Sequence, residues 1–196
     1  VSVLANELRR HCIAGHVARL MAPFSIQDEE AALAAMAQSL GPALTAYHFP
    51  EEALQITRLM QELPPTEPEG RPTPGMQPEA AVSAVLGVDM DELTAAVLRH
   101  WGLHERLLAA ARPLSRSNPV RKPVTREETL RTVASLAHEL AATVLLEAEK
   151  QPAAVHLVYT RYTRALDLTP KECIQNLELA TRLGDGRRRP EPVNPA

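Results

Sequence analysis

The chain has 196 residues, which is enough for one domain of ordinary size or two small ones. Hydrophobic residues make up 45% of it and charged residues 23%, so wholesale disorder is excluded. There are 17 prolines, but only two Phe, three Tyr and one Trp. A β-sandwich or barrel needs more aromatic and β-branched residues on its pleated surface. We therefore predict an all-α protein, a compact multi-helix bundle whose prolines lie between helices.

The charge balance argues against two classes of partner. The 21 basic and 24 acidic residues give a net charge of −3, whereas nucleic-acid-binding proteins usually show a basic surplus or a basic stripe. No apolar run approaches the roughly 18 residues of a membrane helix, and no signal-peptide pattern is present. We expect a cytoplasmic protein that binds neither nucleic acid nor membrane. Because the chain opens with Val-Ser-Val and its first helix begins almost at once, we also expect a piece of a longer polypeptide.

The first two predicted helices each carry an apolar face. One runs from residue 3 to 21, and the next starts at Ser25, with Asp28 completing a capping box. The pair Gly41-Pro42 predicts that this second helix is kinked or split. The residues predicted to face the core are Leu4, Leu8, Cys12, Val17 and Leu20-Met21 in the first helix, and Leu33, Met36, Leu40, Leu44 and Tyr47 in the second.

A proline-rich insertion follows the third helix, which is predicted to begin at Pro50. Residues 64–78 hold six prolines and two glycines, a density that no helix or central strand tolerates. Pro65 and Pro68 form a PxxP pattern, which is typical of a ligand for an SH3-like groove. An exposed, extended loop accounts for the same composition, and we favour the loop.

The second half of the chain is punctuated by clear start and stop signals. Helices are predicted at 79–86, at 93–101 behind an Asp89–Glu92 cap, and at 103–114 after Gly102. The segment 112–123 is basic and loop-like. The longest predicted helix starts at Thr125 and carries the stripe Leu130, Val133, Ala137, Leu140 and Val144.

Two more helices are predicted before the C-terminus. One starts at Pro152, and the last starts at Thr169-Pro170-Lys171-Glu172 and ends at Gly184. Residues 185–196 are predicted to be a disordered tail. The sequence shows no convincing internal repeat and no strand signal.

No residue pattern by itself identifies a reaction. His100 and His104 have the spacing of a zinc-binding pair, but Gly102 is predicted to break the helix between them. Cys12 and Cys173 stand far apart without a CxxC motif, so we expect two small, buried, apolar residues. No serine follows a nucleophile-presenting glycine turn, and no glycine-rich phosphate loop is present. Composition and spacing therefore stop at a helical bundle of unknown role.

Three stretches of the chain, taken in order, resemble the HDOD domain. Residues 31–50 read AALAAMAQSLGPALTAYHFP, similar to the helix pair and YFPEE-like turn of that family. Residues 85–103 read VLGVDMDELTAAVLRHWGL, similar to its glycine-capped helix ending in tryptophan. Residues 133–141 read VASLAHELA, similar to its late helix. The resemblance covers roughly residues 8 to 184 and implies a helical domain over 1–184, with 64–78 inserted.

The resemblance also implies what this domain does. HDOD domains are relatives of the HD metal-dependent phosphohydrolases, and they accompany receiver, kinase or cyclic-dinucleotide domains in bacterial signal transduction. Complete HDOD domains begin with further helices, and nothing matching them precedes residue 1. Either this chain is the C-terminal part of a longer domain, or its front has diverged.

Carried over onto this sequence, the HD metal site has lost most of its ligands. His11 stands at the position of the first histidine, Gln38-Ser39 replaces the His-Asp doublet, and His138 stands at the late aspartate. Both carboxylates are gone, whereas a hard divalent ion needs anionic oxygen ligands. The resemblance therefore implies a pseudoenzyme with no catalytic residue, metal or cofactor. It implies action through a protein partner in a signalling pathway.

Two other functions remain open. One is a metal-dependent HD-type phosphohydrolase acting on nucleotides or cyclic dinucleotides, which would need compensating ligands such as Asp89, Asp91 or Glu139. The other is a regulatory adaptor that binds a small ligand or nucleic acid. The negative charge and the scarcity of aromatic residues argue against nucleic acid.

Overall fold

The computed structural model describes residues 2–63, 73–115 and 120–186. It confirms the all-α prediction, because the described residues form ten helices and no strand beyond a single bridge between Leu63 and Thr73. The helices are α1 (Val3–Met21), α2 (Asp28–Gln38), α3 (Leu40–His48), α4 (Pro50–Met60), α5 (Pro78–Leu86), α6 (Met90–His100), α7 (Glu105–Ala110), α8 (Arg126–Thr143), α9 (Gln151–Leu166) and α10 (Pro170–Gly184).

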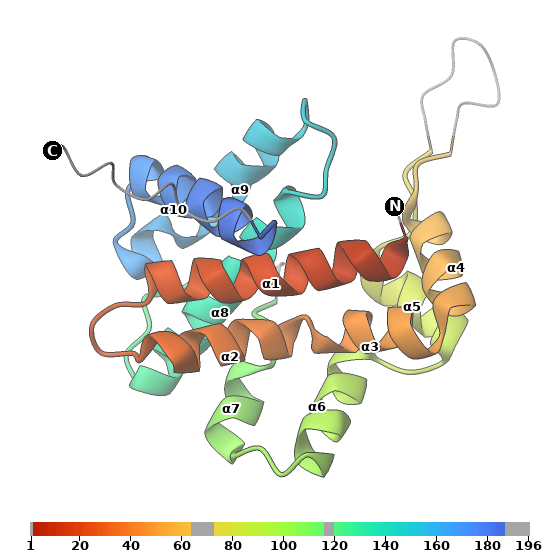
Figure 1. The fold of residues 1–196 in the computed structure, drawn as a ribbon, viewed down its shortest axis with the longest axis horizontal. Helices are drawn as coiled ribbons and strands as arrows, with labels where there is room; N and C mark the ends of the chain where they lie inside the picture. The colour runs from red at the N-terminus through yellow and green to blue at the C-terminus, as the bar shows by residue number, and fades with distance from the viewer. Residues whose placement is uncertain (1, 64–72, 116–119, 187–196) are drawn as a thin grey trace, which may run out of the picture.

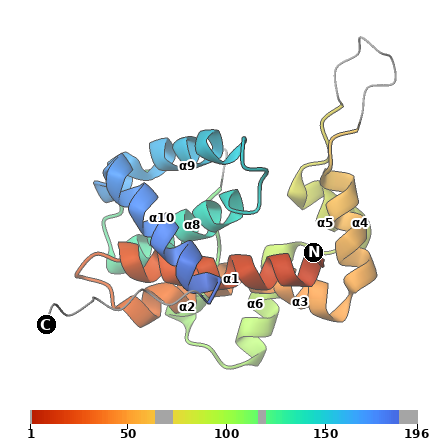
Figure 2. The same ribbon diagram turned by 45° about the horizontal axis from the view of Figure 1, so that its top comes forward.

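Helix α1 is the central element of the bundle. It packs against α2, α8 and α10, and its N-terminal half also reaches α3 and α4. Figure 1 shows α1 crossing the middle of the molecule, with α10 on one side and α2 on the other. Figure 2 shows α9 and α10 at one side and α4 with α5 at the far end. The interior face of α8 is the predicted one, with Leu130, Val133, Ala137 and Leu140 all buried.

The predicted second helix is split, as Gly41-Pro42 indicates, and the break lies at Ser39. Pro42 then lies in the first turn of α3, where a missing N–H costs nothing. The predicted start at Ser25 is wrong. Residues 23–26 form a turn in which the Ile26 amide donates to the Pro23 carbonyl at 2.8 Å, and α2 begins only at Asp28. The turn places Ile26 in the core instead of opening a helix.

Later caps follow the sequence signals closely. Capping boxes at Thr125 and Thr169 are both formed, and Asp89 accepts from the amides of Asp91 and Glu92. Helix α7 is much shorter than the predicted 103–114. Side chains of other helices bind the backbone of residues 112–115 instead, as described below.

The predicted apolar faces of the first two helices are partly wrong. In α2, Leu33 is 55% exposed while Ala31, Ala34 and Ala35 are fully buried. In α3, Tyr47 is 67% exposed. The helices approach through small residues, since a Cβ on Gly15 would stand only 3.0 Å from the Met36 side chain. An alanine face permits this close packing, and large side chains at the same positions would hold the helices apart.

The N-terminal stripe and one cysteine also differ from the prediction. Leu8 and Cys12 are exposed, and the buried face of α1 is formed by Ile13, Ala14, Val17, Ala18 and Met21. Cys173 is fully buried, as expected, and burial raises the pKa of its thiol. Both cysteines are free thiols.

The proline-rich insertion is held at its base by a short ribbon. Leu63 and Thr73 exchange both backbone hydrogen bonds, and the Met76 amide donates to the Leu59 carbonyl at 2.7 Å. The backbones cross so closely that a Cβ on Gly75 would stand 2.2 Å from the Met60 carbonyl oxygen, which requires glycine there. Residues 64–72 of the insertion lie outside the described residues.

The predicted tail begins within the described residues. Asp185 caps the end of α10 and forms an ion pair with Arg9 of α1 at 2.7 Å, while residues 187–196 lie outside the description. Within the described ranges, none of the helices combines the length and the apolar character needed to cross a bilayer.

Candidate functional site

The four positions that the HDOD resemblance assigns to an HD-type site, called the degenerate site below, lie on or next to α1, α2 and α8 at the centre of the bundle. His11 is in the middle of α1, Gln38 is the last residue of α2, and Ser39 joins α2 to α3. His138 lies in α8 and is partly buried. Because α1, α2 and α8 pack against one another, the fold brings these elements together from distant parts of the sequence.

His11 and Ser39 are in direct contact. The His11 Nδ1 atom lies 2.9 Å from the Ser39 hydroxyl, which itself donates to the Met36 carbonyl at 3.0 Å. Since the hydroxyl has a single proton, we assign Nδ1 of His11 as the donor to Ser39. Ser39 is fully buried, so the pair satisfies polar groups at the point where the helix breaks.

Gln38 joins α2 to two other helices. Its side chain is 4% exposed, and its Nε2 atom donates to the Ala110 carbonyl at 2.7 Å and to the Ser135 hydroxyl at 3.2 Å. Ser135 in turn accepts the Leu114 amide at 3.0 Å. The amide of Gln38 therefore links the end of α7 to the interior face of α8.

The backbone of residues 112–115, which we call the strap, lies next to this link and is bound by side chains of α8 and α9. Arg131 of α8 donates to the carbonyls of Arg112 and Pro113, and Arg161 of α9 donates to that of Ser115. Even in a helix over 103–114, the carbonyls of Arg112 and Pro113 would lie in the last turn and that of Ser115 beyond it, so none would have an intrahelical partner. Pro113 has no N–H and disfavours continuing the helix, so α7 ends at Ala110 and side chains of α8 and α9 bind this backbone. The strap and Gln38 form one connected polar network.

The charges near His11 disfavour its protonated form. Burial lowers its pKa, and the adjacent Arg10 lowers it further. Arg10 forms a half-buried ion pair with Glu7 at 2.6 Å. Burial raises the pKa of Glu7, although the same arginine opposes that rise. His11 is thus a hydrogen-bonding residue beside an internal ion pair, in surroundings that favour its neutral form.

The candidate compensating carboxylates are engaged elsewhere. Glu139 accepts from Arg161 at 2.8 Å and from the Tyr162 hydroxyl at 2.7 Å, so it joins α8 to α9. Asp89 caps α6. Burial is the largest cause that raises the pKa of Asp91, in the first turn of the same helix.

The residues of the degenerate site do not fit a catalytic divalent ion. They provide two imidazoles, an amide and a hydroxyl, and no carboxylate to balance the charge of the ion. Among the residues that the structure describes, no group of three or more His, Cys, Asp or Glu side chains could hold a metal. What the arrangement does instead is hydrogen-bond: it ties α1 to the α2–α3 break, and α2 to α7 and α8.

Gly102 separates the other histidine pair, as predicted. It adopts a φ of 74°, a left-handed conformation that ends α6 at His100. His104 lies beyond it as the N-cap of α7, where its ring accepts from the Arg106 amide at 3.3 Å. Trp101, in the most HDOD-like segment, is 55% exposed.

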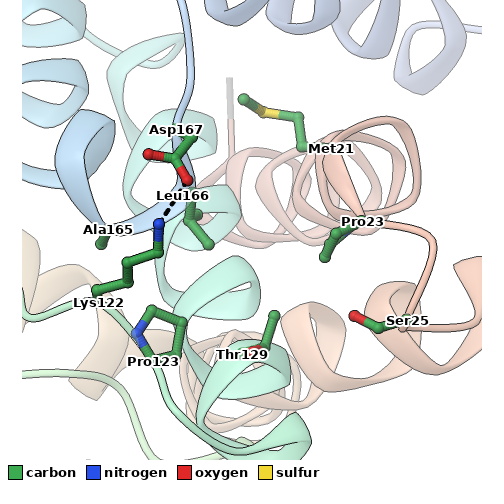
Figure 3. Close-up of a pocket in the computed structure, with 9 residues that line it drawn as sticks. All are labelled: Met21, Pro23, Ser25, Lys122, Pro123, Thr129, Ala165, Leu166 and Asp167. Atoms are coloured by element: carbon green, nitrogen blue, oxygen red, sulfur yellow. Dashed lines mark hydrogen bonds and ion pairs between the residues drawn. The ribbon is translucent and has the colours of Figure 1, made fainter.

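Two hollows of the surface lie away from the degenerate site. A cavity of about 230 Å³ lies between the α1–α2 loop, the start of α8 and the end of α9. Figure 3 shows the side chains that line it. Beside the cavity, the Lys122 ammonium donates a hydrogen bond to the Asp167 carboxylate at 2.8 Å. A second hollow of about 510 Å³ lies between α2 and α7, near Leu33 and His104. Neither is lined by His11, Gln38, Ser39 or His138.

Sequence reasoning missed Ser135 as the partner of Gln38. The available signal was a serine within the apolar stripe of α8, because a buried hydroxyl needs a hydrogen-bond partner. Nothing in the sequence indicated the Ala110 carbonyl as an acceptor, since it is free to accept a bond only because α7 ends there.

Comparison of the chain with models of protein families, with curated proteins and with solved structures finds no match. The likeness to HDOD domains therefore depends on the three stretches quoted above.

Proposed function

We propose that the chain is a non-catalytic HDOD-type module that acts in bacterial signal transduction through contacts with a protein partner. One observation carries this proposal: the residues at the doublet position hydrogen-bond to the protein itself. Ser39 bonds His11 and the Met36 carbonyl, and Gln38 bonds Ala110 and Ser135. A metalloenzyme would keep these side chains for an ion and its bound water.

In this proposal the degenerate site has a structural role. It bonds the buried Ser39 hydroxyl at a helix break and fixes the packing of α1, α2, α7 and α8. Its partners in the cell are proteins of a signalling pathway, such as receiver, kinase or cyclic-dinucleotide domains, and its compartment is the cytoplasm. The partners are inferred from the HDOD resemblance, and the compartment from a sequence without a signal-peptide pattern or a membrane-length apolar run.

The test is metal analysis combined with a phosphodiesterase assay. We expect the purified protein to carry less than stoichiometric transition metal. Bis-p-nitrophenyl phosphate and a cyclic dinucleotide, with Mn²⁺ added, should be hydrolysed no faster than by His11→Ala. The alternative, an HD-type phosphohydrolase, predicts bound metal and a turnover that both His11→Ala and His138→Ala abolish. Circular dichroism of each variant separates a lost site from a lost fold.

A further inference from the structure

Residues 40–100 differ from the rest of the molecule in their charges. Their described part holds seven acidic side chains and two basic ones, Arg58 and Arg99. The acidic residues are Glu51, Glu52, Glu62, Glu79, Asp89, Asp91 and Glu92. All ion pairs of the described chain join residues outside this range. The surplus of carboxylates in residues 40–100 is therefore not neutralised by an ion pair from the described residues.

These carboxylates influence one another. Burial is the main cause of the raised pKa of Asp91, and the charges of Asp89 and Glu79 raise it further, against the opposing charges of Arg112 and Arg131. Asp89 and Asp91 belong to the start of α6, and Glu79 belongs to the start of α5. Acidic groups from two helices thus share one region of negative potential.

An exposed group of rings lies at the corner between α3 and α4. Tyr47 is 67% exposed and Phe49 is 52% exposed, although the whole chain has only six aromatic residues. The His48 ring stands edge-on to Tyr47, with centroids 4.8 Å apart, and 6.4 Å from the Phe49 ring. We call Tyr47, His48, Phe49 and the adjacent Glu51 the aromatic corner.

The aromatic corner continues onto the outer face of α4. Glu51 and Leu54 are three residues apart, so both lie on the same side of the helix, and Leu54 is also exposed. Exposed apolar residues extend further to the ribbon that closes the proline-rich insertion. They are Met60, Leu63 and Met76. The region therefore combines apolar side chains, aromatic rings and carboxylates on α3, α4 and the ribbon.

We propose that the aromatic corner is the docking site for a basic, apolar segment of a partner protein, anchored by an arginine or lysine over the rings of Tyr47 and Phe49. The proposal rests on the proposed function, since it names the chemistry of the partner. Cations bind the faces of aromatic rings, and the exposed Glu51, two residues after Phe49 in the first turn of α4, supplies an opposite charge. Leu54 meets the apolar side chains between the basic ones.

Charge complementarity selects this occupant over others. Nucleic acid and anionic lipid would both meet the surplus of carboxylates, which repels them. An acidic segment would be repelled in the same way. A basic segment is instead steered toward α3–α6, and its binding weakens as salt screens the carboxylates. Interfaces of this kind concentrate their binding energy in a few aromatic residues.

The test uses a fluorescein-labelled amphipathic peptide of alternating Leu and Arg residues, titrated with the full chain at low and at physiological ionic strength. We expect the fluorescence anisotropy of the peptide to show saturable binding that weakens with salt. In NMR spectra of the chain, the amide chemical-shift changes should map to residues 44–63. The matched peptide with Glu in place of Arg should not bind. The variant Tyr47→Ala/Glu51→Gln should bind about tenfold more weakly, and Arg58→Gln should bind at least as tightly as the unmodified chain.

The control variant is Leu157→Ala/Glu178→Gln, which removes one exposed apolar and one exposed acidic side chain from α9 and α10. Its affinity for the basic peptide should equal that of the unmodified chain. The docking inference is overturned if no binding occurs up to about 1 mM peptide, if both double variants bind equally, or if the shifts map elsewhere. Such a result leaves the proposed function intact, because only hydrolysis with bound metal contradicts that.

Discussion

The core cluster around α1, α2, α8 and α10 contains 21 buried residues, whereas the cluster between α4 and α5 contains three: Ile56, Ala81 and Val82. All the ion pairs among the described residues lie outside residues 40–100. The region of the second cluster holds the exposed aromatic corner and carboxylates that form no ion pair among the described residues. Most of the buried apolar surface thus lies in one region, while the other exposes aromatic and acidic side chains.

The largest expected effect is a cavity in the larger core. Leu140→Ala should reduce the free energy of unfolding by an amount in the upper part of the range of about 2–5 kcal/mol, because Leu140 is fully buried on α8. The reduction caused by Ile56→Ala should be in the lower part of that range, since the small cluster can collapse around the cavity. Urea denaturation of both variants measures the difference. An Ile56→Ala loss equal to or greater than that of Leu140→Ala would show that the two regions are equally stabilised.

A smaller effect is expected at the link between the helices of the site. Gln38→Met keeps the size of the side chain but leaves the Ala110 carbonyl and Ser135 without their donor, at a cost of about 1–3 kcal/mol. Glu178→Gln on the exposed face of α10 is the control and should change stability by less than about 0.5 kcal/mol. If Gln38→Met is as stable as the unmodified chain, the structural role assigned to the degenerate site is wrong.

The smallest effect is a pH dependence at the contact between the two regions, where His11 meets Ser39. Burial and Arg10 lower the pKa of His11 in the folded chain, so its contribution to stability is full above the unfolded value of 6.5 and is lost as pH falls through the folded pKa. The raised pKa of Glu7 acts in the opposite direction: its contribution is full at low pH and is lost as pH rises through its folded pKa.

Urea denaturation at about pH 7.5 and about pH 5.5 measures this dependence. His11→Gln should flatten it, and His16→Gln should flatten it less, because burial and Arg19 also lower the pKa of the less enclosed His16. Equal slopes for the unmodified chain and His11→Gln would mean that His11 does not titrate differently on folding.

Local signals explain which parts of the fold could be predicted. The capping boxes at Thr125 and Thr169 and the break before Pro42 depend on residues close in sequence, and all three are formed. The buried face of α2 could not be found in this way. A stripe of large apolar residues pointed to Leu33, but close helix packing buries alanine instead.

The candidate site shows the same limit. Its positions in α1, α2 and α8 were identified from the HDOD resemblance, and the contact between His11 and Ser39 follows from the fold. The bond from Gln38 to Ala110 joins residues 72 positions apart, and its acceptor is a backbone group that any residue has. Which carbonyl accepts this bond depends on where α7 ends in space. The residue type at position 110 does not reveal that.

The ribbon between Leu63 and Thr73 also makes the chain easy to lengthen. The two backbone hydrogen bonds of that pair fix the ends of the insertion, so the helices on either side are positioned whatever the length between them. The entropy of closing a loop rises only with the logarithm of its length, and doubling the nine intervening residues costs about 0.6 kcal/mol. A fluorescent protein or an affinity tag can therefore be spliced between Leu63 and Thr73 with the bundle intact.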